Sequence, residues 1–277
     1  YIDVTKDNSS DKQFSVVSLF SGCGGMDLGF RGDFNVYNTC YEKNNFEIIY
    51  ATDIDKSACE TYEYNFRYQP KCQDIRDIEN NQIPLADIVI GGFPCQDFSH
   101  SGKRKGLETD RGRLYLEMRR VIKNIRPKAF VAENVDGIRT SKIKNDLSAL
   151  DMIMDDFKSL NYNVVYHVLN AADYGVPQIR NRVFIIGVRD DLNKTIYYPS
   201  VIRGKDSFLK PWMTSREAID DLWGKIGDPA FFNHTETDYS KAKFYPGKKM
   251  QGNYQIQADR PSNTIRAEHH GNIEAHY

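Results

Sequence analysis

The chain has 277 residues, of which 40% are hydrophobic and 27% are charged, and its formal net charge is -1. This length suffices for one large α/β domain and a smaller one, and the composition is ordinary for a soluble globular protein. The near-zero charge gives no global sign of a nucleic-acid partner, so any basic surface must be local. No apolar run approaches a membrane span, and no signal peptide is visible.

Two local features of the composition narrow the possibilities. Between Lys103 and Lys128, ten Lys or Arg accompany three acidic residues. This excess fits a phosphate-facing surface, and an ordinary solvated loop and helix face fits it equally well. The five cysteines are odd in number and form no Cys-x-x-Cys pair. We therefore expect no disulfide framework, no metal and a reducing, cytoplasmic compartment.

The first predicted strand, Phe14–Phe20, runs into a glycine-rich turn. Ser21-Gly22-Cys23-Gly24-Gly25 follows it, and a helical pattern begins at Met26. Strand, glycine turn and helix form an arrangement that cradles nucleotides, because glycine permits both the turn and a close backbone approach. The turn contains Gly-x-Gly-Gly rather than the full dinucleotide fingerprint, so a tight turn without a ligand stays open.

An acidic residue ends the second predicted strand, Glu47–Thr52. This residue, Asp53, stands where ribose hydroxyls are usually held in such folds. The polar stretch 33–46 is expected to be an inserted loop that lengthens the spacing from the glycines. A helix is predicted over Lys56–Phe66 with Asp55 as its N-cap, which would leave Asp53 free for a ligand. Asp53 as the cap is the alternative.

The fourth predicted strand, Ala86–Ile90, leads into the stretch Gly91–Ser99. The glycine pair is expected to turn the backbone, and Pro94 then presents Cys95 at the carboxyl edge of a parallel sheet, where ligands bind in open α/β folds. A basic loop, Ser101–Gly106, follows. Neighbouring positive charge lowers a thiol pKa, so this cysteine suits a thiolate nucleophile. A buried structural cysteine is the alternative.

Two further strands end in an acidic residue. The third is predicted to end at Asp74-Ile75, where the acid serves either a ligand or a turn. After a helix over Arg111–Ile125, the fifth strand, Lys128–Ala132, ends at Glu133 beside the cysteine strand. A protonated carboxyl group there can donate to a ring nitrogen. Helix capping or a salt bridge is the alternative.

The remaining elements of the larger domain predict an antiparallel edge. A core-facing helix over Ile143–Leu160 precedes strands at Tyr162–Leu169 and Val183–Val188, whose short connection favours an antiparallel pair. We therefore expect an otherwise parallel sheet with one reversed strand. If the second of these strands already begins before Arg180, Arg180 and Arg182 lie on the same face of it. Isolated arginines on an edge strand are more often surface residues.

From about residue 190 the residue pattern of the sequence changes. Periodicity weakens, and aromatic residues alternate with basic ones. We place a domain boundary within residues 190–199 and take the two domains as 1–190 and 191–277. Basic and aromatic residues in a loop-rich module suit nucleic-acid contact, and they also suit a small β domain.

Together these motifs resemble the DNA (cytosine-5)-methyltransferases of bacterial restriction-modification systems. The matching stretches occur in the family's order: Leu19–Gly25, Asp53–Lys56, Gly92–Gln96, Glu133–Val135 and Gln178–Arg182. The resemblance implies an α/β, Rossmann-like methyltransferase fold with a mostly parallel sheet and one antiparallel strand. It also implies a small target-recognition domain.

The resemblance implies S-adenosylmethionine as methyl donor and S-adenosylhomocysteine as product. The residues carried over are Phe20, Ile54, Asp74 and Ile75 for adenine, Asp53 for ribose, Gly22, Gly24 and Gly25 for the methionine end, and Pro94 for closing the site.

The implied reaction methylates C5 of a flipped-out cytosine. The thiolate of Cys95 attacks C6 and makes C5 carbanion-like, Glu133 holds or protonates N3, Arg182 binds O2 and Arg180 supports the site. The base that removes the C5 proton is not identified. The same chemistry on tRNA, or an inactive DNA-binding chain, are the alternatives.

The implied partner is double-stranded DNA, read in the major groove by the 191–277 module. Candidate contacts are Ser99, Ser101, Arg111 and Thr264. The family's last two motifs are absent, because the chain ends before them. We expect either a missing C-terminal segment or a second chain of a split enzyme to supply them, and otherwise a monomer.

Overall fold

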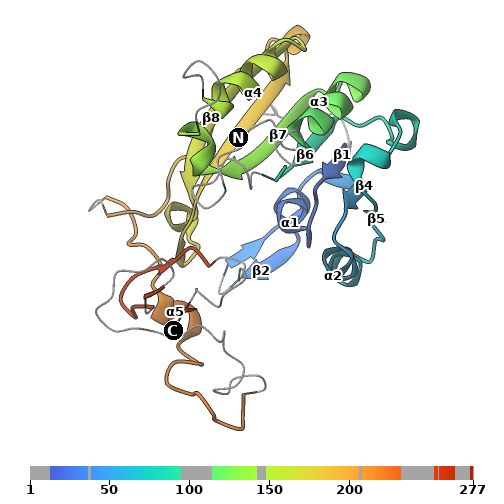
Figure 1. Cartoon of the computed structure of the whole chain (residues 1–277). Coiled ribbons are helices and arrows are strands. Elements are labelled where there is room, and N and C mark those ends of the chain that lie inside the picture. The colour runs from blue at the N-terminus through green and yellow to red at the C-terminus, as the bar shows by residue number, and fades with distance from the viewer. Residues whose placement is uncertain are drawn as a thin grey trace. The chain divides into compact units, whose positions relative to one another are not determined.

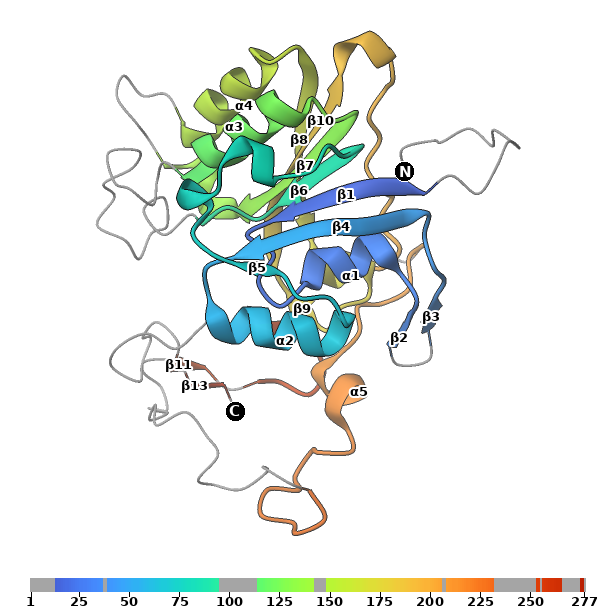
Figure 2. The ribbon, with the colours of Figure 1, turned by 90° about the vertical axis from the view of Figure 1, so that its right-hand side faces the viewer.

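The computed structural model describes residues 13–36, 39–94, 114–141, 148–205, 208–231, 253–254, 256–265 and 275–276. It divides into two compact units (Figures 1 and 2). One comprises Tyr1–Val168 with Arg182–Pro199, and the other comprises Leu169–Asn181 with Ser200–Tyr277. The first unit ends at Pro199, the last residue of the stretch 190–199 in which the sequence places the boundary. The second includes a segment that precedes this boundary in the sequence.

A seven-stranded sheet has the order β5-β4-β1-β6-β7-β10-β8. Its strands are β1 (Phe14–Leu19), β4 (Phe46–Asp53), β5 (Lys71–Cys72), β6 (Ile88–Gly91), β7 (Ala129–Val135), β8 (Tyr162–Asn170) and β10 (Asn181–Arg189). The pairs from β5 to β7 are parallel, and β10 is antiparallel to β7. The predicted α/β fold with one reversed strand is confirmed.

Helices cover both faces of this sheet (Figure 2). They are α1 (Gly25–Arg31), α2 (Lys56–Phe66), α3 (Leu114–Ile125) and α4 (Ala149–Lys158). The central strand β1 packs on both sides, because successive side chains of a strand point to opposite faces. Val17 and Leu19 join the core with Met118 of α3, whereas Val16 belongs to a second cluster that includes Phe30 of α1.

Side-chain caps explain where two helices begin. Asp55 accepts a hydrogen bond from the Ala58 amide at 2.9 Å and caps α2, as predicted. Ser148 caps α4 in the same way, accepting from the Asp151 amide at 3.0 Å. The described part of α4 therefore begins at Ala149 rather than at residue 143. Residues 142–147 and 111–113 lie outside the described residues.

Two predictions about the outer strands were wrong. The stretch 33–46 is not a plain loop, because β2 (Phe34–Val36) and β3 (Thr39–Tyr41) form an antiparallel hairpin in it. The Phe34 and Tyr41 rings stack with centroids 4.7 Å apart, an aromatic pair that stabilises so short a ladder. The third strand, β5, ends at Cys72, because Asp74 caps the turn that follows.

The edge of the sheet is antiparallel, as predicted. The Ala171 amide donates to the Arg180 carbonyl at 3.0 Å, and at the other end the Asp190 amide donates to the Asn161 carbonyl at 3.1 Å. In the part of the chain that the structure describes, no helix is both long and apolar enough to cross a membrane.

The second unit consists of short elements. They are β9 (Gln178–Ile179) paired with β12 (Ser262–Asn263), β11 (Asn253–Tyr254) paired with β13 (Ala275–His276), and α5 (Ser215–Ile219). Helix α5 begins at a capping box formed by Thr214 and Glu217. The indole of Trp212 donates to the Asp173 carboxylate at 2.8 Å. Among the described residues, the 3-10 helices are η1 (Ile75–Asp77), η2 (Asn80–Gln82), η4 (Asp136–Arg139), η6 (Ala171–Tyr174) and η7 (Asp190–Leu192).

Candidate functional site

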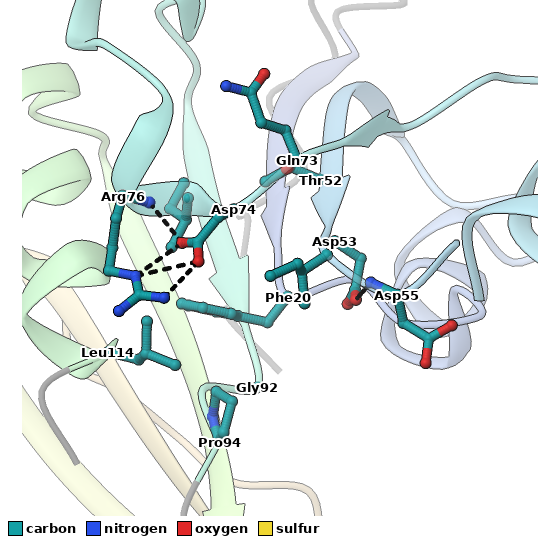
Figure 3. Close-up of a pocket in the computed structure, with 12 residues that line it drawn as sticks. Phe20, Thr52, Asp53, Asp55, Gln73, Asp74, Arg76, Gly92, Pro94 and Leu114 are labelled. Carbon is teal, nitrogen blue, oxygen red and sulfur yellow. Dashed lines mark hydrogen bonds and ion pairs between the residues drawn. The ribbon is translucent and has the colours of Figure 1, made fainter. Parts of the chain in front are cut away.

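A cavity of about 540 Å³ opens at the carboxyl edge of the parallel strands in the first unit (Figure 3). Its volume lies in the usual range for small-molecule and cofactor sites. The residues of its wall that the sequence predicts as donor-binding are Phe20, Asp53, Ile54, Asp74, Ile75 and Pro94. The residues that sequence reasoning missed are Thr52, Asp55, Gln73, Arg76, Gly92 and Leu114.

Phe20 is placed in the cavity by an unusual backbone conformation. Its φ is 53°, in the left-handed region that non-glycine residues rarely adopt. Such conformations cluster at functional sites, where the surrounding structure maintains them. Figure 3 shows the Phe20 ring between the Asp74–Arg76 pair and Asp53. This is the position expected of a side chain that stacks on a planar ligand.

The three predicted glycines do not line the cavity but shape the loop beside it. Gly22 and Gly24 have φ values of 52° and 88°. A Cβ on Gly24 would lie 2.3 Å from Cε2 of Phe66, so glycine is also required there by space. A Cβ on Gly22 or Gly25 would meet no atom of the described residues within 4 Å, so these backbones are open to a ligand's approach.

Asp53 is not free in the way the sequence suggested. Its Oδ2 accepts the Gly22 amide at 2.7 Å, and its Oδ1 accepts the Asp55 amide at 2.9 Å. The carboxylate therefore ties the glycine loop to the end of β4, and each oxygen retains acceptor capacity for a ribose hydroxyl. Ile54, next to it, has 66% of its surface exposed, which is unusual for isoleucine and leaves an apolar face to the cavity.

Asp74 is held by Arg76, the most informative of the missed residues. The guanidinium donates to both carboxylate oxygens, with an Nη2–Oδ2 distance of 2.6 Å (Figure 3). These hydrogen bonds lower the pKa of Asp74. Asp74 also caps η1 by accepting a hydrogen bond from the Arg76 amide. Of the two roles that the sequence left open, a ligand or a turn, the structure therefore shows the turn. Asp74 and Arg76 are only two residues apart, and no sequence pattern predicts an ion pair at this spacing.

A second group of predicted residues meets on β7 and β10. Arg182 Nε lies 2.8 Å from Glu133 Oε1, and the two side chains are 17% and 26% exposed. They are diagonal neighbours, because Glu133 stands opposite Phe184 in the ladder. A Cβ on Gly92 would lie 3.3 Å from Glu133 Oε2, so Gly92 leaves space for this carboxylate. Two predicted catalytic residues are thus paired with each other.

Asn134 fixes the backbone that leads to the predicted nucleophile. It is 2% exposed, and its Nδ2 donates to the Phe93 carbonyl at 3.1 Å. Gly91 and Gly92 have no positive φ. Gly91 is instead required by space, since a Cβ there would lie 2.9 Å from the Leu19 carbonyl oxygen.

Cys95, together with Ser99, Ser101 and Arg111, lies outside the described residues. Among the described residues, no group of His, Cys, Asp or Glu could hold a metal ion.

Two predicted residues belong to the second unit. The Arg180 amide donates to the side chain of Asn170 at 3.1 Å. The Thr264 hydroxyl donates to the Ile179 carbonyl at 2.7 Å, beside the β9–β12 pair. Thr264 thus supports the segment that precedes Arg180, and a DNA contact for it stays a prediction.

A sequence profile of the family described as C-5 cytosine-specific DNA methylase matches residues 14–275. The chain belongs to this family. It is 40% identical over 245 residues to the type II methyltransferase M.BspRI of Lysinibacillus sphaericus, covering 79% of this chain and 55% of that protein. It is 42% identical over 235 residues to M.AquIA of Picosynechococcus, covering 75% of this chain and 88% of that protein.

The chain spans about half the length of the first curated relatives that it matches. Its fold is also that of solved methyltransferases. The Entamoeba histolytica methyltransferase EhMeth superposes with a TM-score of 0.53 at 23% identity, covering 68% of this chain and 55% of that one.

Proposed function

We propose that this chain transfers a methyl group from S-adenosylmethionine to C5 of a cytosine in duplex DNA, as part of a restriction-modification system. The observation that carries the proposal is the Glu133–Arg182 pair, which lies beside the strand end that leads to Cys95. The family match and the type II methyltransferases among the relatives support it.

The cavity of the first unit is the proposed donor site. Its residues fit the donor: Phe20 and Ile54 offer an aromatic and an aliphatic surface to adenine, and Asp53 offers acceptors to the ribose. When bound, S-adenosylmethionine supplies an electrophilic methyl group. Pro94 lines the cavity and is bonded directly to Cys95, so the donor site adjoins the nucleophile.

The remaining chemistry falls to side chains of this chain. Cys95 adds to C6 as a thiolate across the C5–C6 double bond, which makes C5 a nucleophile that takes the methyl group. Loss of the C5 proton then restores the double bond and breaks the bond from C6 to Cys95. Glu133 and Arg182 present a carboxyl and a guanidinium group from neighbouring strands, complementary to ring N3 and O2. The target base must leave the duplex, at a cost of a few kcal/mol.

The test uses duplex DNA in which 5-fluorocytosine replaces cytosine, together with S-adenosylmethionine. Fluorine at C5 blocks release of the enzyme, so a covalent complex should survive denaturing electrophoresis. The Cys95→Ser variant should bind DNA without forming the complex. The proposal fails if the wild-type chain binds DNA and donor but yields no adduct, or if Cys95→Ser yields one. The same experiment with tRNA separates the two nucleic-acid substrates.

A further inference from the structure

One arginine of α3 reaches across to the turn that forms a wall of the donor cavity. Nη2 of Arg120 donates to the carbonyls of Ile75 and Ile78, at 3.0 and 3.1 Å. Nη1 donates to the side-chain oxygen of Asn80. Nε donates to Glu117, one turn earlier on the same helix, at 2.8 Å. The guanidinium therefore binds three points of a segment some 40 residues away in sequence.

The bound segment contains donor-site residues and is tied internally by the Asp74–Arg76 pair and by two backbone hydrogen bonds. Beside it, Nε2 of Gln73 donates to the Asp77 carbonyl at 3.1 Å. Asp74, Ile75 and Arg76 line the cavity. Within the turn, the Asp77 amide donates to the Asp74 carbonyl at 3.0 Å and the Ile78 amide to the Ile75 carbonyl at 3.3 Å. The preceding strand, β5, has only two residues.

Two buried side chains anchor this turn in the core, and the Arg120 guanidinium joins it to α3. Ile75 and Ile78 are 5% and 1% exposed and anchor the turn in the core. Apolar packing holds the turn down but is non-directional. The carbonyls that Arg120 binds fix the turn's orientation, because a planar guanidinium places several donors in a rigid fork. The direction in which Asp74 and Arg76 face the cavity thus depends on α3.

We propose that Arg120 is a positioning residue for the methyl donor: it holds the Asp74–Ile78 turn in the orientation that the adenine end of S-adenosylmethionine requires. This inference rests on the proposed donor role of the cavity. It assigns Arg120 no contact with the donor, since the residue does not line the cavity.

The neighbouring arginine on the same helix provides a matched control. Arg119 donates to the Asp156 carbonyl at 3.3 Å and to the Ser159 hydroxyl at 3.1 Å, both at the end of α4. It makes the same kinds of hydrogen bond from the same helix, but to a region outside the donor cavity. Arg119→Met and Arg120→Met therefore remove similar groups with different targets.

The experiment measures calorimetric affinity for S-adenosylhomocysteine, together with KM for S-adenosylmethionine and kcat. We expect Arg120→Met to weaken affinity about tenfold, equivalent to about 1.4 kcal/mol. KM for the donor should rise, with kcat at saturating donor and DNA affinity little changed. Arg119→Met should leave donor affinity within about twofold. Glu117→Gln, which loosens the Arg120 fork, should give a smaller loss in the same direction.

Amide hydrogen exchange supplies a readout that needs no ligand. In Arg120→Met the Asp77 and Ile78 amides should exchange faster than in wild type, and in Arg119→Met they should not. If Arg120→Met does not fold, Arg120→Lys keeps the charge without the fork and should show the same effects at smaller size.

Unchanged donor affinity and exchange in Arg120→Met, or equal losses of donor affinity in Arg119→Met, would overturn the inference. These results differ from failure of the proposed donor role of the cavity, in which the wild-type chain itself would not bind S-adenosylhomocysteine, and from failure of the proposed reaction, in which the wild-type chain would bind it but form no adduct.

Discussion

Replacing Gly24 by alanine tests whether the glycine loop is built as the structure indicates. Gly24 precedes α1 with φ at 88°. A Cβ there would lie 2.3 Å from Cε2 and 2.8 Å from Cζ of Phe66, and 3.0 Å from Cδ2 of Tyr62. The Phe66 ring cannot move away easily, because it stacks on Tyr62 with centroids 4.3 Å apart and lies under the guanidinium of Arg31.

Two separate costs follow from this geometry. The left-handed backbone costs a non-glycine residue about 1–2 kcal/mol. Overpacking against the trapped rings costs about 1–3 kcal/mol more. We therefore expect Gly24→Ala to lower the free energy of unfolding by about 2–5 kcal/mol, a substantial share of a typical stability of about 5–15 kcal/mol.

Urea unfolding of four proteins separates the two costs: wild type, Gly24→Ala, Phe66→Ala and the double variant. In the Phe66→Ala background the ring is gone, so Gly24→Ala should cost only the backbone term of about 1–2 kcal/mol. If Gly24→Ala costs the same in both backgrounds, the ring contact is not the cause. A single-variant cost below about 0.5 kcal/mol would refute the reasoning altogether.

Three further changes test other parts of the first unit. Asn134→Ala releases the Phe93 carbonyl and should lower kcat by about tenfold to a hundredfold with little change in donor affinity, measured by methyl transfer and calorimetry. Gly187→Ala places a Cβ 2.1 Å from the fully buried Phe130 ring and should destabilise by about 1–3 kcal/mol or more in urea. Burial raises the pKa of the Asp27 carboxyl, so the folded protein keeps a proton that the unfolded chain releases, and stability falls as pH rises from about 4 to the raised pKa. Asp27→Asn should remove this slope from a plot of urea midpoint against pH, and parallel curves for the two proteins would show that another group causes it.

The elements that could be predicted from the sequence are those with local signals. Helix α2 has the predicted bounds, because Asp55 marks its start and no stronger contact moves it. The reversed strand β10 followed from the short connection before it. The hairpin at residues 34–41 was missed because three-residue strands show too little alternation, and its stability depends on one aromatic pair.

The sequence predicted which residues belong to the site but not the hydrogen bonds and ion pairs that join them. The sequence placed Glu133 and Arg182 near one edge, and their 2.8 Å pairing follows from a strand register that no local pattern encodes. From the sequence, the Asp53 carboxylate was expected to bind a ligand or to cap a helix, whereas it binds the Gly22 amide. Arg120 carried no signal, since an arginine on an amphipathic helix normally faces solvent.

The end of β4 and helix α2 together hold the glycine loop, through the Asp53–Gly22 hydrogen bond and the packing of Phe66 and Tyr62 at Gly24. The start of α2 adjoins Asp53, which binds the Gly22 amide. Its middle contributes Tyr62, whose hydroxyl donates to the buried Asp27 of α1 at 2.8 Å. Helix α1 has only seven residues, too few to be stable alone. Removing the Tyr62 hydroxyl should therefore disturb the loop as well as the core: Tyr62→Phe leaves Asp27 with Ser18 as its remaining side-chain donor, at a cost of about 1–3 kcal/mol. Donor affinity should fall together with stability, and a variant that loses stability but binds S-adenosylhomocysteine as wild type does would show that the loop is held independently of α2.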